Sequence, residues 1–247
     1  MSGHVELMQP LQVGQATVSH RSVEHVSTTA KSREGSAART PFHDEALNLV
    51  QRIFLMQAQK PPHVVVFAGV EHGSGCSQIC ASVAETLARV VRRPVCLLEG
   101  NFRSPALAST SNMTNDYGLA DALVSEEAIT IFCKPLAQEN LWILSAGALD
   151  ADSPSLLTSE NLKSRLIELR NAFEFVIVDA PPLESFAEAI ILGQLADGLV
   201  LVLEAGSTRR EPAAAAVSSL RSSNIPILAA VLNKHTQPVP RKISKLI

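Results

Sequence analysis

The segment from Val64 to Ala88 constrains the fold of this chain more than any other. It opens with apolar residues rich in valine, which is typical of a strand buried on both faces of a parallel sheet. Gly69, Gly73 and Gly75 follow, and apolar residues then recur at helical spacing. A strand that passes through a glycine loop into a helix gathers unpaired backbone N–H groups and the positive end of the helix dipole around one small space. The segment therefore predicts a phosphate-binding turn.

The predicted turn lacks a cation. The usual phosphate loop has Gly-Lys-Ser/Thr here, because the lysine reaches the β- and γ-phosphates and the hydroxyl holds magnesium. In this chain the triplet is Gly75-Cys76-Ser77, so the hydroxyl is present and the lysine is absent. Unit charges about 4 Å apart interact by roughly 4 kcal/mol at an effective dielectric constant near 20, which predicts triphosphate binding or transfer weakened by about a thousandfold. The alternative is a turn whose glycines only allow tight packing of the strand against the helix.

The rest of the chain alternates short apolar runs with segments of helical period. Further strands are predicted at 95–98, 141–144, 175–178, 199–203 and 227–232. Helices are predicted around 41–54, 118–124, 157–169 and 184–195, and after Pro212. Aromatic residues make up only 4% of the chain, so the core must be mostly aliphatic, as in parallel sheets. The alternation predicts an α/β fold, a doubly wound and mostly parallel sheet flanked by helices.

Composition divides the chain into three parts. Residues 1–40 are rich in small and polar residues and show no sustained period, so we expect a disordered N-terminal arm. Residues 41–236 form the predicted domain, and residues 237–247 form a flexible basic tail. A net charge of −3 argues against nucleic-acid binding. There is neither an apolar run of about 18 residues nor the apolar core of a signal peptide, so we expect a cytoplasmic protein without a membrane span.

Two further sets of side chains have a simple structural interpretation. The four cysteines show no metal-ligand spacing, and we expect reduced thiols that fill packed elements. A redox sensor at Cys76 and Cys80 is the alternative, because Cys76 is placed at a helix N-terminus, where thiol pKa values fall. We expect Lys163, Arg165 and Arg170 on the solvent side of their helix.

Several motifs occur in a fixed order along the chain. They are the loop at 73–77, the stretch Leu-Leu-Glu-Gly-Asn-Phe-Arg at 97–103, Tyr-Gly-Leu at 117–119, Leu-Ser-Ala-Gly at 144–147, Phe-Val-Ile-Val-Asp-Ala-Pro-Pro at 175–182, Ala-Asp-Gly at 196–198 and Val-Leu-Asn-Lys at 231–234. From about Pro41 to Thr236 the chain thereby resembles the cytoplasmic domain of the bacterial tyrosine autokinases of capsule and exopolysaccharide synthesis. These kinases belong to a wider class of P-loop ATPases that includes the septum-site and chromosome-partition ATPases.

The resemblance implies a catalytic site in which three motifs meet. The phosphate loop corresponds to Gly73, Ser74, Gly75, Cys76, Ser77 and Gln78. In the second motif Glu99 and Asn101 replace two aspartates, and Arg103 remains. The third motif ends at Asp179, and the adenine-contacting asparagine of the family matches Asn233. The implied catalytic residues are Glu99, Arg103 and Asp179, and the implied ligands of Mg²⁺ are Ser77 and Asp179.

These departures from the family pattern predict reduced nucleotide binding and slow phosphoryl transfer. Glu99 is one methylene longer than aspartate, which moves its carboxylate by about 1 Å and can cost roughly a hundredfold in rate. Asn101 cannot act as a base or neutralise Mg²⁺. We therefore expect the binding of ATP or ADP with Mg²⁺ to be weakened or lost, and phosphoryl transfer to be inefficient.

The expected function is a catalytically impaired subunit that regulates or scaffolds the synthesis and export of exopolysaccharide or capsule. Its implied partner is a membrane polysaccharide co-polymerase or export component, which would hold the chain at the inner face of the plasma membrane. The alternative is an active ATPase or protein kinase of the same family, or a partition-type ATPase, and Ser77, Arg103 and Asp179 favour it. Tyr117 is the only tyrosine, so we expect no autophosphorylated tyrosine tail.

Assembly into a homo-oligomer stays open. In the family, a glutamate and two arginines on the helix before the phosphate loop join neighbouring subunits into a ring. Glu45 matches the glutamate, whereas Asn48 and Gln51 occupy the positions of the arginines. Arg52 lies one residue after the second of these positions.

Overall fold

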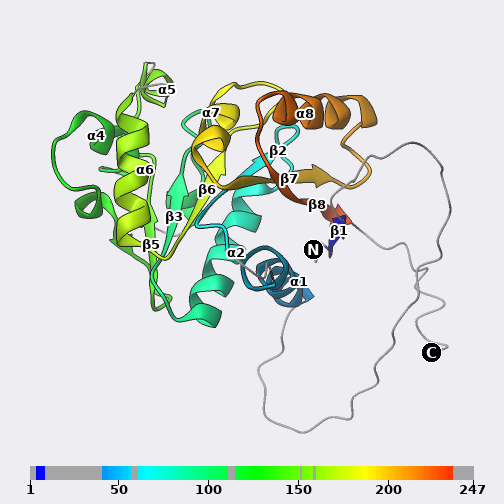
Figure 1. The fold of residues 1–247 in the computed structure, drawn as a ribbon, viewed down its shortest axis with the longest axis horizontal. Coiled ribbons are helices and arrows are strands. Elements are labelled where there is room, and N and C mark those ends of the chain that lie inside the picture. Colours follow the sequence, from blue (N-terminus) through cyan, green and yellow to red (C-terminus); the bar gives the residue numbers. More distant parts are fainter. Residues whose placement is uncertain are drawn as a thin grey trace, which may run out of the picture.

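A mixed sheet covered by helices on both faces makes up the fold (Figure 1). The computed structural model describes residues 4–8, 41–56, 61–110, 115–150, 152–157 and 160–235. In these residues the strands are β1 (His4–Met8), β2 (Val64–Gly69), β3 (Val95–Glu99), β4 (Lys134–Pro135), β5 (Leu141–Leu144), β6 (Phe175–Ala180), β7 (Gly198–Glu204) and β8 (Ile227–His235). The α-helices are α1 (Pro41–Val50), α2 (Cys76–Val91), α3 (Leu107–Thr110), α4 (Leu119–Val124), α5 (Ser153–Leu156), α6 (Glu160–Ala172), α7 (Glu188–Leu195) and α8 (Arg210–Ser222), with a π-helix η1 (Gln51–Leu55) and a 3-10 helix η2 (Ile129–Phe132).

The strand order confirms the predicted doubly wound sheet. Across the described residues it runs β1-β8-β7-β2-β6-β3-β5-β4. The pairs from β8 to β5 are all parallel, and only the outer strands β1 and β4 pair antiparallel to their neighbours. β2 lies between β6 and β7, and every residue of β2, β3 and β6 is buried. The central position of β2 places the loop that follows it at the middle of the carboxyl edge, where open α/β sheets bind ligands.

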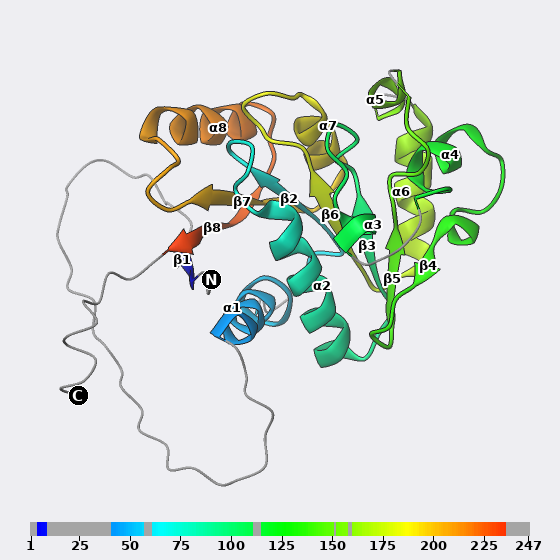
Figure 2. The ribbon, with the colours of Figure 1, turned by 180° about the vertical axis from the view of Figure 1, so that it is seen from behind.

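Each face of the sheet has its own apolar core. On one face α1, η1 and α2 contribute side chains such as Leu49, Phe54 and Leu87. On the other face α4, α6, α7 and α8 contribute residues such as Leu166 and Leu220. Figure 2, seen from behind, shows α1 and α2 on the opposite side of the sheet from α7 and α8. The cores are mostly aliphatic, as the composition predicts. Among the described residues, no helix combines the length and apolar character needed to cross a bilayer.

The N-terminal region differs from the sequence expectation at one place. His4–Met8, within the expected disordered arm, forms β1 and pairs with β8. β8 would otherwise present an open edge of unpaired N–H and C=O groups, and even a short segment can form hydrogen bonds with such an edge. The rest of the expected arm and the expected tail at 237–247 lie outside the described residues.

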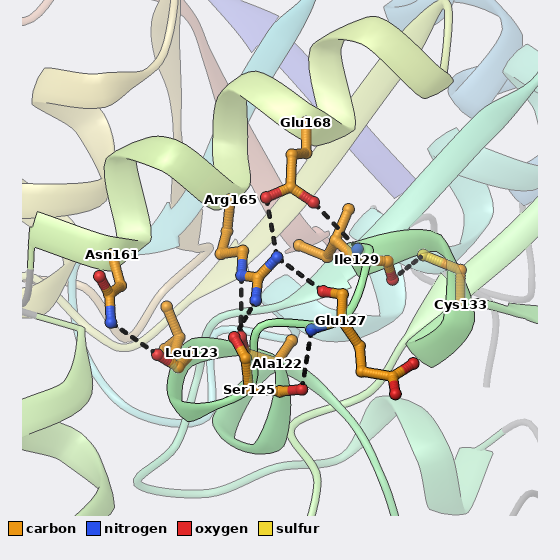
Figure 3. A network of polar contacts seen from close by, with 9 residues as sticks. All are labelled: Ala122, Leu123, Ser125, Glu127, Ile129, Cys133, Asn161, Arg165 and Glu168. Atoms are coloured by element: carbon orange, nitrogen blue, oxygen red, sulfur yellow. Dashed lines mark hydrogen bonds and ion pairs between the residues drawn. The ribbon is translucent and has the colours of Figure 1, made fainter.

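Arg165 does not lie on the solvent side of α6, so that expectation was wrong. Its side chain is buried, with 7% of the residue exposed. The guanidinium donates to the carbonyl oxygens of Ala122 and Glu127, each at 2.8 Å, and to that of Ser125, and it pairs with Glu168 at 2.8 Å (Figure 3). Carbonyls at the end of a helix have no intrahelical donor. Arg165 therefore satisfies the end of α4 and ties it to α6.

Loss of the Arg165 side chain is expected to destabilise the protein. Arg165→Met would leave three carbonyls without their donor, and we expect the free energy of unfolding to fall by about 3 kcal/mol. Urea unfolding measures this change. Lys163→Met on the exposed side of the same helix is the matched control, with an expected change within about 0.5 kcal/mol. Equal stabilities of the two variants would contradict the role assigned to Arg165.

Candidate functional site

The turn between β2 and α2 has the conformation that the sequence predicts. Gly73 and Gly75 have φ angles of 82° and 80°, in the left-handed region that glycine adopts without strain. Space also requires glycine at position 75, because a Cβ atom there would lie 2.4 Å from the side-chain nitrogen of Asn233. α2 then begins at Cys76, so its N-terminal N–H groups open into the loop. This geometry suits an anion such as a phosphate.

A cavity of about 430 Å³ lies against this loop, and we call it the phosphate-loop cavity. All six predicted loop residues, 73–78, line it. Asp179, from the end of β6, lines it as well, and so does Asn101. The volume falls within the range of small-molecule sites, which is about 300 to 1,000 Å³. The structure thus brings together the loop and one of the three predicted catalytic residues.

The carboxyl group of Asp179 lies in an environment that disfavours its charged form. It is fully buried, and its Oδ2 atom has no hydrogen-bond partner. Burial raises its pKa to about 6, and the Glu99 charge adds to this, while hydrogen bonds from Ser77, Cys76 and Cys80 oppose it. The hydrogen bond from Ser77 places the two predicted magnesium ligands beside each other. That they hold a metal ion stays a prediction.

The raised pKa makes stability depend on pH in a definite direction. Because the folded pKa is about 6 and the unfolded value 3.8, ionising Asp179 costs stability as pH rises through this interval. Asp179→Asn removes the titration, so its stability relative to the wild type should rise by about 2 kcal/mol between pH 4 and pH 7. Urea unfolding of the metal-stripped proteins at several pH values measures this. A difference that does not change with pH would contradict the buried, unpaired state of Asp179.

The two thiols of α2 do not have the lowered pKa that the redox alternative assumes. A hydrogen bond from Cys80 lowers the pKa of Cys76, but burial and the Asp179 charge outweigh it and raise that pKa above its usual value. Burial raises the pKa of Cys80 well above its usual value, and Cys76 adds to the rise. Reactive thiols need the opposite shift. The raised pKa values of Cys76 and Cys80 therefore disfavour the redox-sensor alternative and agree with the expected unreactive thiols.

Glu99 lies outside the phosphate-loop cavity, and its carboxylate accepts hydrogen bonds from backbone N–H groups. It is fully buried at the end of β3. One carboxylate oxygen accepts the N–H groups of Ala106 and Leu107 at 2.5 and 2.6 Å, and the other accepts that of Ala146 at 3.1 Å. These bonds connect the segment after β3 to the segment after β5. The catalytic role that the resemblance implies for Glu99 stays a prediction.

Arg103 does not line the phosphate-loop cavity either. Its guanidinium donates twice to Glu188, at 2.7 and 3.0 Å, and lies 4.9 Å from the centre of the Phe186 ring. It lines a separate cavity of about 340 Å³ with Ser155. The structure therefore leaves two of the three predicted catalytic residues outside the phosphate-loop cavity.

The end of β8 holds the loop in place. Asn233 is buried and donates its side-chain N–H to the carbonyl of Ser74 at 2.8 Å, and it does not line the cavity. Lys234 donates to the carbonyl of Gly73 at 2.7 Å and pairs with Glu204 at 3.1 Å. Sequence reasoning missed Lys234 as a cation beside the loop, and its position directly after Asn233 was the available sign.

The second motif of the sequence and the helix before the loop can also be placed. Asn101 is buried and accepts the N–H of Ser104 at 3.2 Å. Asn48, Gln51 and Arg52 are exposed on α1 and η1. Their exposure leaves the question of a homo-oligomer open.

Comparison with proteins of known sequence places the chain among kinases. No protein-family model matches it. The tyrosine-protein kinase YwqD of Bacillus subtilis is 30% identical over 161 residues, which are 65% of this chain and 68% of YwqD. The succinoglycan biosynthesis transport protein ExoP of Rhizobium meliloti is 28% identical over 201 residues, which are 80% of this chain and 25% of ExoP.

Solved structures share the fold. The kinase domain of VpsO superposes with a TM-score of 0.71 at 23% identity, covering 78% of this chain and 96% of that domain. The septum site-determining protein MinD of Pyrococcus horikoshii, solved with Mg-ADP, superposes with a TM-score of 0.59 at 17% identity, covering 68% of each chain. The fold is therefore that of a P-loop NTPase. Together with the ordered motifs and the identity to YwqD, it shows that this chain belongs to the bacterial tyrosine-protein kinases.

Proposed function

We propose that this chain is a member of the tyrosine-kinase family with impaired phosphoryl transfer, acting as a regulatory or scaffolding subunit in exopolysaccharide or capsule synthesis and export. One observation carries the proposal. Among the described residues, no lysine or arginine lines the phosphate-loop cavity. Phosphoryl transfer depends on positive charge around the transferred group, and a helix N-terminus supplies only a fraction of it.

The arrangement of the other site residues supports impairment. The Glu99 carboxylate is occupied by three backbone N–H groups. Arg103 would have to leave Glu188 to reach a phosphate. Weak binding of ATP or ADP is still compatible with the loop, because its backbone has the anion-binding form and the neighbouring Ser77 and Asp179 would hold Mg²⁺. The MinD structure was solved with Mg-ADP, which supports nucleotide binding by this fold.

The relatives support the process in which the chain acts. ExoP is named for succinoglycan biosynthesis and transport, and YwqD for tyrosine kinase activity. We infer a membrane polysaccharide co-polymerase or export component as the partner, which would bring residues 41–236 to the inner face of the plasma membrane as one domain. A scaffolding role needs the fold and its surface to be intact and does not need turnover.

Complementation separates scaffolding from catalysis. A strain without the gene should lose or alter its polysaccharide, and both the wild type and Asp179→Ala should restore it. Phosphate release from ATP by the purified wild type should be no faster than by Asp179→Ala. Restoration by the wild type alone, or unchanged polysaccharide in the deletion strain, would contradict the proposed function.

An active ATPase or protein kinase is the second candidate. The contact between Ser77 and Asp179 inside the cavity favours it, and so does Lys234, whose ammonium group lies 2.7 Å from the carbonyl oxygen of Gly73. If Lys234 supplies the missing charge, phosphate release should depend on Asp179 and fall on Lys234→Met. Release that is independent of both residues would exclude this candidate.

A further inference from the structure

We propose that Cys76, Cys80 and Asp179 form a binding site for a thiophilic divalent cation, with Zn²⁺ as the preferred ion, beside the phosphate-loop cavity. The inference goes beyond the proposed function, because it requires neither nucleotide binding nor turnover. No spacing of cysteines in the sequence indicates this site. It arises because β6 brings a carboxylate against the first two turns of α2.

The three donor groups already lie close together. One ligand atom from each, the two thiol sulfurs and a carboxylate oxygen, all lie within 4.8 Å of one another. Cys80 Sγ donates to Asp179 Oδ1 at 3.7 Å. In a tetrahedral zinc site with Zn–S bonds of about 2.3 Å and Zn–O bonds of about 2.0 Å, neighbouring donors lie roughly 3.5 to 3.8 Å apart. Movement of about 1 Å or less therefore closes the site.

The backbone supports this geometry. Cys76 and Cys80 are four residues apart on α2, so their side chains lie one above the other on the same face. Asp179 is held on β6, which pairs with the strand that leads into the loop. Donors fixed on a helix and a strand are positioned more rigidly than donors on loops.

A second observation points to a missing positive charge. Asp179 is fully buried, and its Oδ2 atom has no hydrogen-bond partner. A buried carboxylate oxygen without a partner is costly, and proteins usually satisfy such a group with a donor or a metal ion. A cation bound by Asp179 and the two thiols would balance the charge of this buried carboxylate.

The donor set selects the ion. Two sulfurs and one carboxylate suit Zn²⁺, whereas Mg²⁺ takes oxygen ligands in an octahedron. Binding would displace the thiol protons to solvent, because a metal-bound thiol is deprotonated. Cys76 and Asp179 line the phosphate-loop cavity, so the fourth position of the ion would face it. Water or a phosphate oxygen would complete the coordination there.

The other thiol pair of the chain provides a matched control. Cys96 and Cys133 also interact with each other. Among the described residues, no carboxylate joins them in a group with metal-ligand geometry. Two neighbouring thiols alone are therefore not expected to bind the ion, and Cys133→Ser should leave binding unchanged.

Titration of the reduced, metal-stripped full chain with Co²⁺ tests the proposal without nucleotide. We expect one Co²⁺ per chain with a sulfur-to-cobalt charge-transfer band, which Zn²⁺ abolishes by displacement. Cys80→Ser should lose the band, and Asp179→Asn should weaken the affinity by about 100-fold or more. The absence of a band, with all thiols reduced, would overturn the proposal, and so would an unchanged band in Cys80→Ser.

Protection of the wild-type thiols from alkylation tests the site even if a variant does not fold, because it needs no substitution. Cys76 and Cys133 are both partly exposed. Zn²⁺ should slow the alkylation of Cys76 and leave that of Cys133 unchanged, as read by mass spectrometry of the peptides. Equal alkylation of Cys76 with and without Zn²⁺ would overturn the site. Since this readout involves no phosphate release, it can fail while the proposed function stands, and the reverse also holds.

Discussion

Replacing Cys76 with lysine is expected to raise the affinity for ATP with Mg²⁺ by up to about a thousandfold. The backbone of the turn has the anion-binding form, and Gly73 and Gly75 keep the required angles. What the described part of the cavity lacks is a cation. A lysine at position 76 would supply one unit of charge beside the loop, worth about 4 kcal/mol at a distance near 4 Å and an effective dielectric constant near 20.

The gain should depend on charge and not on side-chain length. Cys76→Met fills similar space without a charge and should leave the affinity near that of the wild type. The buried carboxylate of Asp179 would attract the new ammonium group, so Cys76→Lys with Asp179→Asn tests whether this attraction limits the gain. Isothermal titration calorimetry measures all three affinities. Equal affinities of Cys76→Lys and Cys76→Met would show that the absence of a lysine at position 76 does not limit nucleotide binding.

Removal of the Glu99 carboxylate is expected to destabilise the fold severely. Three backbone N–H groups, those of Ala106, Leu107 and Ala146, donate to it inside the protein. Glu99→Ala would leave them buried without an acceptor, at about 1 to 3 kcal/mol each, so we expect the free energy of unfolding to fall by roughly 3 to 9 kcal/mol. This is a large part of the 5 to 15 kcal/mol that is usual for a domain.

Two further variants identify the origin of this loss. Glu99→Gln keeps one acceptor oxygen but turns an N–H₂ group toward a backbone donor, so an intermediate loss is expected. Glu85→Ala, at an exposed position of α2, should change stability by no more than about 0.5 kcal/mol. Urea unfolding followed by circular dichroism gives all three values. A fully stable Glu99→Ala protein would favour the catalytic role implied by the resemblance.

The sequence was a good guide to the centre of the fold. Strand, loop and helix were found at β2 and α2 because each has its own local pattern: a valine-rich run, glycines, then apolar residues at helical spacing. The parallel sheet followed from the alternation of such units. The pairing of β1 with β8 could not be predicted in this way, because it joins distant segments and β1 is only five residues long.

Individual polar residues were harder to predict than the elements that carry them. Glu99 and Asp179 both lie at the carboxyl ends of buried strands, and yet only Asp179 lines the cavity. The reason is that the segment after β3 folds back and donates its N–H groups to Glu99. Sequence position gives the edge of the sheet, but it does not show which N–H groups return to a carboxylate. Arg165 was predictable in retrospect. It lies between Leu162 and Leu169 at helical spacing, on the buried stripe of α6.

The most direct test is the calorimetric titration of the folded, metal-stripped wild type with ATP and with ADP, each with and without Mg²⁺. The loop keeps an anion-binding backbone, and no lysine or arginine among the described residues lines its cavity. We therefore predict a dissociation constant for ATP with Mg²⁺ near the millimolar range, about a thousandfold weaker than a micromolar site. Magnesium-dependent binding in the low micromolar range would contradict the account, because the site would then hold nucleotide without the lysine.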